Sequence, residues 1–314
     1  MQTLYVVDSL KDQVKAGEPL SILNKKIDQS RQLLTYLVYF VTEVARFAEK
    51  DALKKSSKHL PTQADLNINT KIVGNELLWK IIEAEGFKTA IAEYKLPHLI
   101  DSELLKKTYQ TLTLSAEYKE YIDLQSRDKK SEKDIIEYIF STVLLPNEDF
   151  INHVEEKFIN WDDDAEQMQL LILNIIQKPS SANFNTILTK DKLDFARQLT
   201  QTVLDKEVHS RELIKPKLKN WDADRIASLD MIILQMGVCE LLYFETIPTK
   251  VTINEYIDLA KDYSTPQSGQ FVNGLLDNIH KELMASGKIV KKQFYSLLKT
   301  LKTKFAKEIL FQLV

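Results

Sequence analysis

Residues 221–283 read WDADRIASLDMIILQMGVCELLYFETIPTKVTINEYIDLAKDYSTPQSGQFVNGLLDNIHKEL, and this stretch decides the fold because it holds three consecutive helical patterns. The first, from about residue 224 to 244, is apolar on nearly every side, which is typical of a buried central helix. Ile247-Pro248 interrupts it, since proline lacks an N–H and disfavours the α conformation in the residue before it. A second helix follows from Thr252, which forms a capping-box pattern with Glu255. The third begins with Pro266 at its first helical position.

The first turn of the third helix carries polar side chains beside an aromatic one. Gln267, Ser268 and Gln270 precede Phe271, which lies about a quarter-turn from the centre of the apolar face at 100° per residue. Two interpretations stay open for Phe271: a phenylalanine at the flank of the core, or an exposed aromatic platform.

This stretch resembles the bacterial transcription antitermination factor family NusB. The resemblance is specific because several short segments occur in the family's order and spacing. It covers residues 188–283 well and residues 1–15 weakly. The segments that carry it are Cys239-Glu240-Leu241, Ile247-Pro248 with Val251, Ile253-Asn254-Glu255, Leu259-Ala260-Lys261, and Ser268 followed by Phe271-Val272-Asn273-Gly274-Leu275-Leu276-Asp277.

The resemblance implies an all-α, NusB-like RNA-binding protein rather than an enzyme. NusB-like proteins pair with NusE, a small-subunit ribosomal protein, and the pair binds boxA-type single-stranded RNA in ribosomal RNA leaders. The resulting RNA polymerase antitermination complex suppresses premature termination. Some relatives self-associate through the partner surface, so a homodimer is an open alternative.

The same resemblance, together with the chemistry of the side chains, yields candidate site residues. Aromatic side chains suit single-stranded RNA because each unstacked base can stack on one, which stabilises binding by about 1–3 kcal/mol. Asp230 matches a family acid near the partner surface, and the alternative for it is a solvated helix charge. The expected RNA-binding residues are Tyr5, Gln267, Ser268, Gln270 and Phe271.

Residues 1–18 are expected to form the first helix of the NusB-like core. Tyr5 matches a family tyrosine near the RNA surface, and a half-buried core tyrosine is the alternative. In the family an arginine-rich segment that contacts RNA phosphates precedes this helix, whereas this sequence begins at Met1 inside the helical pattern. We therefore expect either a start upstream of Met1 or the loss of part of the contact with RNA.

Residues 19–187 form a long segment that ordinary NusB proteins lack. Periodic apolar residues predict helices at 20–49, 73–85, 102–124, 130–144, 148–159 and 165–176. The pattern predicts an accessory helical bundle inserted before residues 188–287 of the core, and 314 residues suffice for two such units. Nothing in the residue pattern of the insertion indicates a chemical role.

Residues 288–314 form a basic tail in which lysines alternate with apolar residues at helical spacing. This spacing predicts an amphipathic cationic helix. Three interpretations stay open: a helix packed on the body with its lysines solvated, an auxiliary contact to RNA phosphates, or a helix on a partner or membrane surface.

Composition and motifs argue against several other classes of protein. The net charge of −3 means that any RNA-binding site must be local. A signal peptide and a long uncharged apolar run are absent, so we expect a cytoplasmic protein. The sequence has no glycine-rich phosphate loop, no CxxC pair and no HxxxH pair, so no cofactor or metal is expected.

Glu240 is the acid that needs an explanation, because its helix is apolar on nearly every side. A buried carboxylate is unfavourable without hydrogen bonds. We expect the amides of Asn254 or Asn273 to donate them, in a structural bracket between the three helices.

Two other functions were weighed against RNA binding. One is a helical protein-interaction scaffold that keeps the fold but has lost RNA binding, suggested by the missing basic segment and the large insertion. The other is an RNA-modifying enzyme, since NusB-like modules also occur fused to methyltransferases. An enzyme of that kind needs an α/β domain with a glycine-rich turn, and the pattern predicts none.

Overall fold

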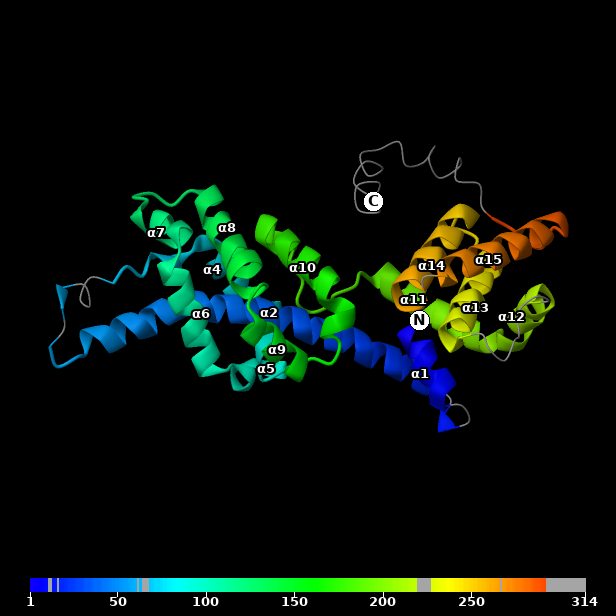
Figure 1. Cartoon of the computed structure of the whole chain (residues 1–314), viewed down its shortest axis with the longest axis horizontal. Coiled ribbons are helices and arrows are strands. Elements are labelled where there is room, and N and C mark those ends of the chain that lie inside the picture. Colours follow the sequence, from blue (N-terminus) through cyan, green and yellow to red (C-terminus); the bar gives the residue numbers. More distant parts are fainter. Residues whose placement is uncertain are drawn as a thin grey trace. The chain divides into compact units, whose positions relative to one another are not determined.

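The computed structural model describes residues 1–10, 13–15, 17–60, 62–63, 68–218, 227–265 and 267–291. Within these ranges every regular element is a helix (Figure 1), which confirms the prediction of an all-α protein. The chain divides into two compact units, residues 1–24 with 190–314, and residues 25–189. Each unit has a hydrophobic core of its own.

In the first unit the central element is α13, as the sequence predicts. Every residue from Ile232 to Leu241 is buried. Gly237 allows close packing here, since a Cβ at this position would lie 2.9 Å from the side chain of Leu276. The helices described in this unit are α1 (Gln2–Leu10), α11 (Lys190–Asp205), α12 (Glu207–Ile214), the 3₁₀ turn η6 (Lys215–Leu218), α13 (Ser228–Tyr243), α14 (Thr249–Tyr263) and α15 (Ser268–Ala285).

Two predicted helix boundaries in this unit need correction. Helix α14 begins at Thr249, with Pro248 as its N-cap residue, so Thr252 lies inside the helix and is buried. The capping-box prediction for Thr252 was therefore wrong. Helix α1 ends at Leu10, earlier than the predicted residue 18, and Gly17 adopts a φ of 83° just before the next helix. Glycine suits this turn because it lacks the Cβ that penalises positive φ.

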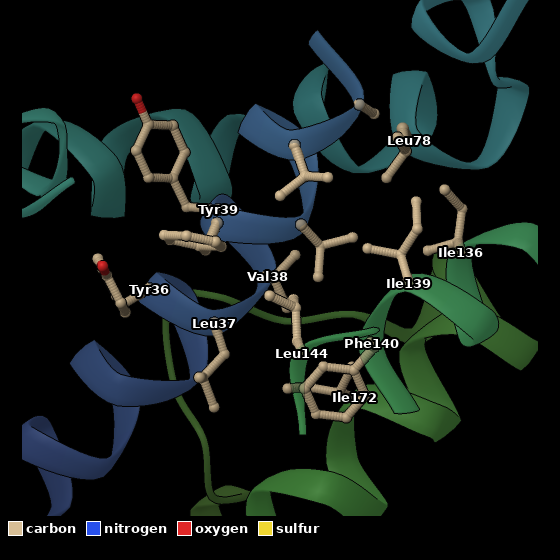
Figure 2. Close-up of a cluster of buried hydrophobic side chains, with 14 of the residues drawn as sticks. Tyr36, Leu37, Val38, Tyr39, Leu78, Ile136, Ile139, Phe140, Leu144 and Ile172 are labelled. Atoms are coloured by element: carbon tan, nitrogen blue, oxygen red, sulfur yellow. The ribbon is translucent and has the colours of Figure 1, made fainter. Parts of the chain in front are cut away.

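The second unit is built around α2, whose residues from Leu33 to Val41 are buried without interruption. Figure 2 shows Leu37 and Val38 of this helix among side chains of other helices of the unit, including Leu78, Ile139 and Ile172. The helices described in it are α2 (Glu18–Ser56), which begins within the range of the first unit, η2 (Lys71–Gly74), α4 (Glu76–Ile82), α5 (Glu85–Glu93), η3 (Leu96–Leu99), α6 (Ser102–Leu114), α7 (Ala116–Asp123), α8 (Lys129–Tyr138), η4 (Ile139–Leu144), α9 (Glu148–Lys157), α10 (Trp161–Gln177) and η5 (Pro179–Ser181).

Two predicted helices of this unit are divided in the structure. The helix predicted at 102–124 breaks at Ser115, whose hydroxyl accepts a hydrogen bond from Tyr118 N and so caps α7. Serine competes in this way with the regular helical pattern because its side chain can bond nearby backbone groups. The helix predicted at 130–144 becomes π-helical from Ile139. The apolar pattern continues through both positions, which is why spacing alone did not reveal them.

Some predictions concern residues that the structure does not describe. The predicted tail helix lies almost wholly in residues 292–314, and residues 288–291 are not helical. The start of the helix predicted at 224–244 likewise falls in residues 219–226. Of the helices in the described ranges, none combines the length and apolar character that crossing a membrane requires.

Candidate nucleic-acid interface

The first turn of α15 presents three of the candidate RNA-binding residues. Gln267 is the N-cap residue, and both it and Gln270 are exposed. Phe271 is half-buried and packs against the core of the first unit. Phe271 is thus a core-flank residue whose ring is partly exposed, and the two glutamines beside it are open to solvent.

The N-terminus of α15 also suits a phosphate group. The Gln267 side chain makes no capping hydrogen bond to the helix. N–H groups of a first helical turn lack intrahelical partners and carry positive partial charge, so they attract anions.

A lysine that sequence analysis gave no role lies against this turn. Gly269 is buried, and a Cβ on it would lie 2.8 Å from Cγ of Lys261. The Lys261 side chain is 57% exposed and its ammonium pairs with Asp258 at 2.8 Å. The Lys261 stem therefore crosses α15 at Gly269 and carries a cation beside the first turn. A glycine in the first turn of a helix was the sequence signal for this close approach.

Ser268 is not exposed, which corrects the expectation that its hydroxyl contacts RNA. The side chain is 3% exposed. Its Oγ donates to Asp230 Oδ2 at 2.9 Å, accepts from the backbone N–H of Thr265 at 3.2 Å, and lies 2.9 Å from the Thr265 hydroxyl and 3.0 Å from Ser264 Oγ. The hydroxyl fixes the turn that leads into α15.

Asp230 is also buried, so neither a partner-facing acid nor a solvated helix charge describes it. It is 7% exposed and lies in the first turn of α13, where a carboxylate is favoured by the helix dipole. One oxygen accepts the Ser268 hydrogen bond, and the other is buried with no hydrogen-bond partner among the described residues. The Asp230–Ser268 bond joins the first turns of α13 and α15.

Tyr5 lies on a different helix from the other RNA-binding candidates. It belongs to α1, which packs on α13, and its side chain is 44% exposed. Tyr5 is thus exposed in part, and its contact with RNA stays a prediction.

Glu240 is buried and hydrogen-bonded, but its partners are not the predicted ones. Thr252 Oγ1 donates to Glu240 Oε1 at 2.7 Å, and Tyr256 Oη donates to Oε2 at 2.8 Å. Asn254 and Asn273 are exposed instead. The carboxylate thus joins α13 to α14 only, because those asparagines lie on the solvent-facing sides of their helices.

Two ionisable side chains near the Glu240 carboxylate, Tyr256 and Lys291, have shifted pKa values. Burial raises the pKa of Tyr256 well above its ordinary value of 10.0, and the Glu240 charge adds to the effect. Lys291 donates through Nζ to the backbone carbonyls of Glu240 and Phe244, at 3.0 and 2.7 Å. Burial lowers the pKa of Lys291, which is the side chain that holds the chain after α15 against the end of α13.

A metal centre is not visible in the part of the chain that the structure describes. None of its His, Cys, Asp and Glu side chains form a group of three or more that is arranged to hold an ion.

Comparison with known proteins identifies relatives of the region that contains this site. The sequence model of the NusB family matches residues 159–281, a range that begins inside the predicted insertion. The transcription antitermination protein NusB of Salinibacter ruber is 43% identical over 132 residues, which cover 41% of this chain and 76% of that protein. The protein of the same name from Finegoldia magna is 39% identical over 94 residues, which cover 30% of this chain and 69% of that protein. A solved structure titled "T. maritima NusB, P3121, Form 2" is 32% identical and covers 40% of this chain and 82% of that one, with a TM-score of 0.29.

Proposed function

This chain belongs to the NusB family of transcription antitermination proteins, and on that basis we propose that it binds boxA-type single-stranded RNA together with NusE. In this proposal the RNA-bound pair joins the RNA polymerase antitermination complex. The observation that carries it is the first turn of α15, where a partly exposed phenylalanine lies beside two exposed glutamines at a helix N-terminus.

The chemistry of this turn suits a single strand with unstacked bases. A base stacks on the exposed part of the Phe271 ring, since every base offers a π-face to an aromatic side chain. The amides of Gln267 and Gln270 each offer donors and an acceptor to base edges. A backbone phosphate is attracted by the first-turn N–H groups and by the Lys261 ammonium.

Asp230 and Ser268 are buried behind this surface and hold its first turn in place. Their 2.9 Å hydrogen bond fixes the start of α15 relative to α13, so they orient Gln267, Gln270 and Phe271 without touching RNA. Tyr5 supplies a second exposed aromatic ring on α1. The contribution of Tyr5 to RNA affinity is measured separately, in the variant Tyr5→Ala.

RNA titrations of the full chain with NusE test the proposal. A boxA-like single strand is compared with a scrambled strand, for the unchanged protein and for Phe271→Ala. Loss of one stacking interaction of about 1–3 kcal/mol lowers the affinity for the boxA-like strand by about 5- to 150-fold. Affinity that falls with rising salt further indicates phosphate contacts.

Phe195→Ala is the matched control. Phe195 is also a partly buried phenylalanine on the core of the first unit, but its ring packs on Phe244, with centroids 5.4 Å apart. It should lower stability and leave RNA affinity unchanged. Weak binding that is equal for both strands and unchanged in Phe271→Ala would instead support a protein-interaction scaffold that has lost RNA binding.

A further inference from the structure

The second unit has a groove of about 350 Å³ between α7 and α8, which are consecutive in the chain and pack together (Figure 1). Each helix lines it with residues at positions i, i+3, i+4 and i+7, which lie on one face of a helix. In chain order each wall carries a polar residue, a carboxylate and then two apolar or aromatic side chains. The residues are Glu117, Glu120, Tyr121 and Leu124 on one wall, and Ser131, Asp134, Ile135 and Tyr138 on the other.

Part of the apolar surface of the groove is open to solvent. Leu124, the C-cap residue of α7, is 40% exposed, and Tyr138 is half-buried. The surface that solvent reaches inside the groove is more apolar than polar. Clefts of this size with an accessible apolar lining commonly bind ligands or the side chains of a peptide.

A buried carboxylate fixes the two walls relative to each other. Tyr121 Oη donates to Glu132 Oε1 at 2.8 Å, which joins α7 to α8. Glu132 is 3% exposed, and its Oε2 accepts from the backbone N–H of Glu76 at 2.7 Å. Arg127 Nη1 pairs with Oε1 at 3.2 Å. Because these bonds form the groove in the unbound protein, binding a partner requires little ordering of the walls.

The rim of the groove is acidic. Glu117, Glu120 and Asp134 are exposed, and none of them pairs with a cationic side chain of the described residues. The nearby Lys71 is bound elsewhere, since its Nζ donates to backbone carbonyls at the C-terminal end of α7 at 2.7 and 2.8 Å. Such a rim attracts a cationic partner and repels the phosphates of RNA or of an anionic membrane.

The dimensions of the groove suit a helix. Each wall runs from position i to i+7, about 10 Å along its axis at 1.5 Å per residue, or about two turns. Helices that bind in grooves present their contact residues over the same spacing. Open apolar surface together with unpaired carboxylates calls for a partner helix that carries both apolar and cationic side chains.

We propose that the groove between α7 and α8 binds a basic amphipathic helix of a partner protein. Apolar side chains of that helix cover Leu124 and Tyr138, and its lysines or arginines pair with Glu117, Glu120 and Asp134. This assigns the second unit a protein-binding role that goes beyond RNA binding and does not depend on it.

Peptide titrations of the full chain, followed by fluorescence anisotropy, test the apolar part of this contact. The probe is the labelled peptide LKKLLKLLKKLLKL, and the comparison peptide AKKAAKAAKKAAKA keeps its lysines and helix-forming residues without the large apolar side chains. The leucine peptide should bind more tightly. Leu124→Ser should weaken its binding about fivefold, because part of the apolar contact is lost. Leu124 lies outside the hydrophobic core of the unit, so the substitution leaves the fold intact.

Charge reversal tests the acidic rim. Glu120→Lys/Asp134→Lys changes one carboxylate on each wall and should weaken binding of the leucine peptide about tenfold at low salt, since two attractions become repulsions. The matched control is Glu155→Lys/Glu166→Lys, which changes the net charge equally at exposed positions of α9 and α10. This control should bind the peptide like the unchanged protein.

Three results would overturn the proposal. The first is equal affinity of the two double variants for the leucine peptide, which would leave at most an attraction to the acidic protein as a whole. The second is equal affinity of the unchanged protein for the leucine and alanine peptides. The third is unchanged binding of the leucine peptide to Leu124→Ser.

Discussion

Two carboxylates of α13 show how much the immediate neighbours decide the role of a charged residue. Glu240 has a hydroxyl donor on each oxygen, from Thr252 and Tyr256. Asp230 has one donor, Ser268, and its second oxygen is buried without a partner among the described residues. The Glu240 carboxylate accepts a hydrogen bond on each oxygen and links α13 to α14. The Asp230 carboxylate instead has one oxygen that accepts no hydrogen bond from the described residues, beside the candidate RNA surface.

Replacing Glu240 should destabilise the first unit. Glu240→Ala leaves the buried hydroxyls of Thr252 and Tyr256 without their acceptor, which costs about 1–3 kcal/mol of the free energy of unfolding. Urea denaturation measures the loss. Asn254→Ala is the control, since Asn254 is an exposed residue of α14, the helix that also carries Thr252 and Tyr256. This variant should change the free energy of unfolding by no more than about 0.5 kcal/mol. Equal losses for the two variants would contradict the observed hydrogen bonding.

Alkaline pH should weaken the first unit. Burial raises the pKa of Cys239 from 9.0 to about 12 and that of Tyr256 well above 10.0. The folded state therefore keeps protons that the unfolded chain releases, so this stabilisation is complete below about pH 9 and is lost as the pH rises towards about 12. Urea titrations between about pH 8 and 11 should show a declining free energy of unfolding, with a smaller decline for Cys239→Ala. A free energy of unfolding that does not change over this pH range would contradict the raised pKa values of Cys239 and Tyr256.

At the scale of the element, α13 serves as the common contact for its neighbours because it is apolar on nearly every side. Helices α14 and α15 pack on it and on each other. Gly237 permits this, since a side chain there would meet Leu276 at 2.9 Å and Tyr256 at 3.2 Å. The spacing of the helices is thus set by the smallest residue in the middle of the central helix.

A larger residue at Gly237 should separate these helices. Gly237→Val overpacks the contact with Leu276 and Tyr256, and we expect a loss of about 1–3 kcal/mol in the free energy of unfolding. Gly274→Ala on α15 is the matched control, because nothing lies within 4 Å of a Cβ built there. Alanine should stabilise that helix by about 0.5–1 kcal/mol. Thermal unfolding of both variants measures the difference, and a neutral Gly237→Val would show that the helices can adjust.

At the scale of the whole molecule, the described residues form two hydrophobic cores, and the candidate RNA surface belongs to one of the two units. The candidate residues belong to the first unit, whereas Tyr36, Phe40 and Phe150 belong to the core of residues 25–189. Two cores allow the units to lose structure separately. Damage to the second core should therefore spare RNA binding.

Phe40→Ala tests this separation. Phe40 is fully buried and packs on Phe150, with ring centroids 4.9 Å apart, so its truncation should cost the second unit about 3–5 kcal/mol. Hydrogen exchange should accelerate in α8 and stay unchanged in α13, and affinity for the boxA-like strand should be retained. Equal acceleration in both helices would show that the chain unfolds as one cooperative unit.

Sequence periodicity determined most of the helical architecture because the apolar pattern of a helix is a local property. It predicted the buried character of α13, the break at Ile247-Pro248 and a helical segment between the two parts of the NusB-like core. It missed breaks such as Ser115, where one side chain competes for backbone hydrogen bonds while the apolar pattern continues.

The sequence by itself also determined the family, since the order and spacing of its motifs lie within the chain. Only the tertiary structure decided which candidate side chains are available to a ligand. It buries Ser268 and Asp230 against each other and gives Glu240 the hydroxyls of α14 in place of the expected asparagines. It leaves Gln267, Gln270 and part of Phe271 exposed. Burial and hydrogen-bond partners depend on how helices far apart in the sequence pack together. For α13, which is apolar on nearly every side, no local pattern specifies which face meets which neighbour.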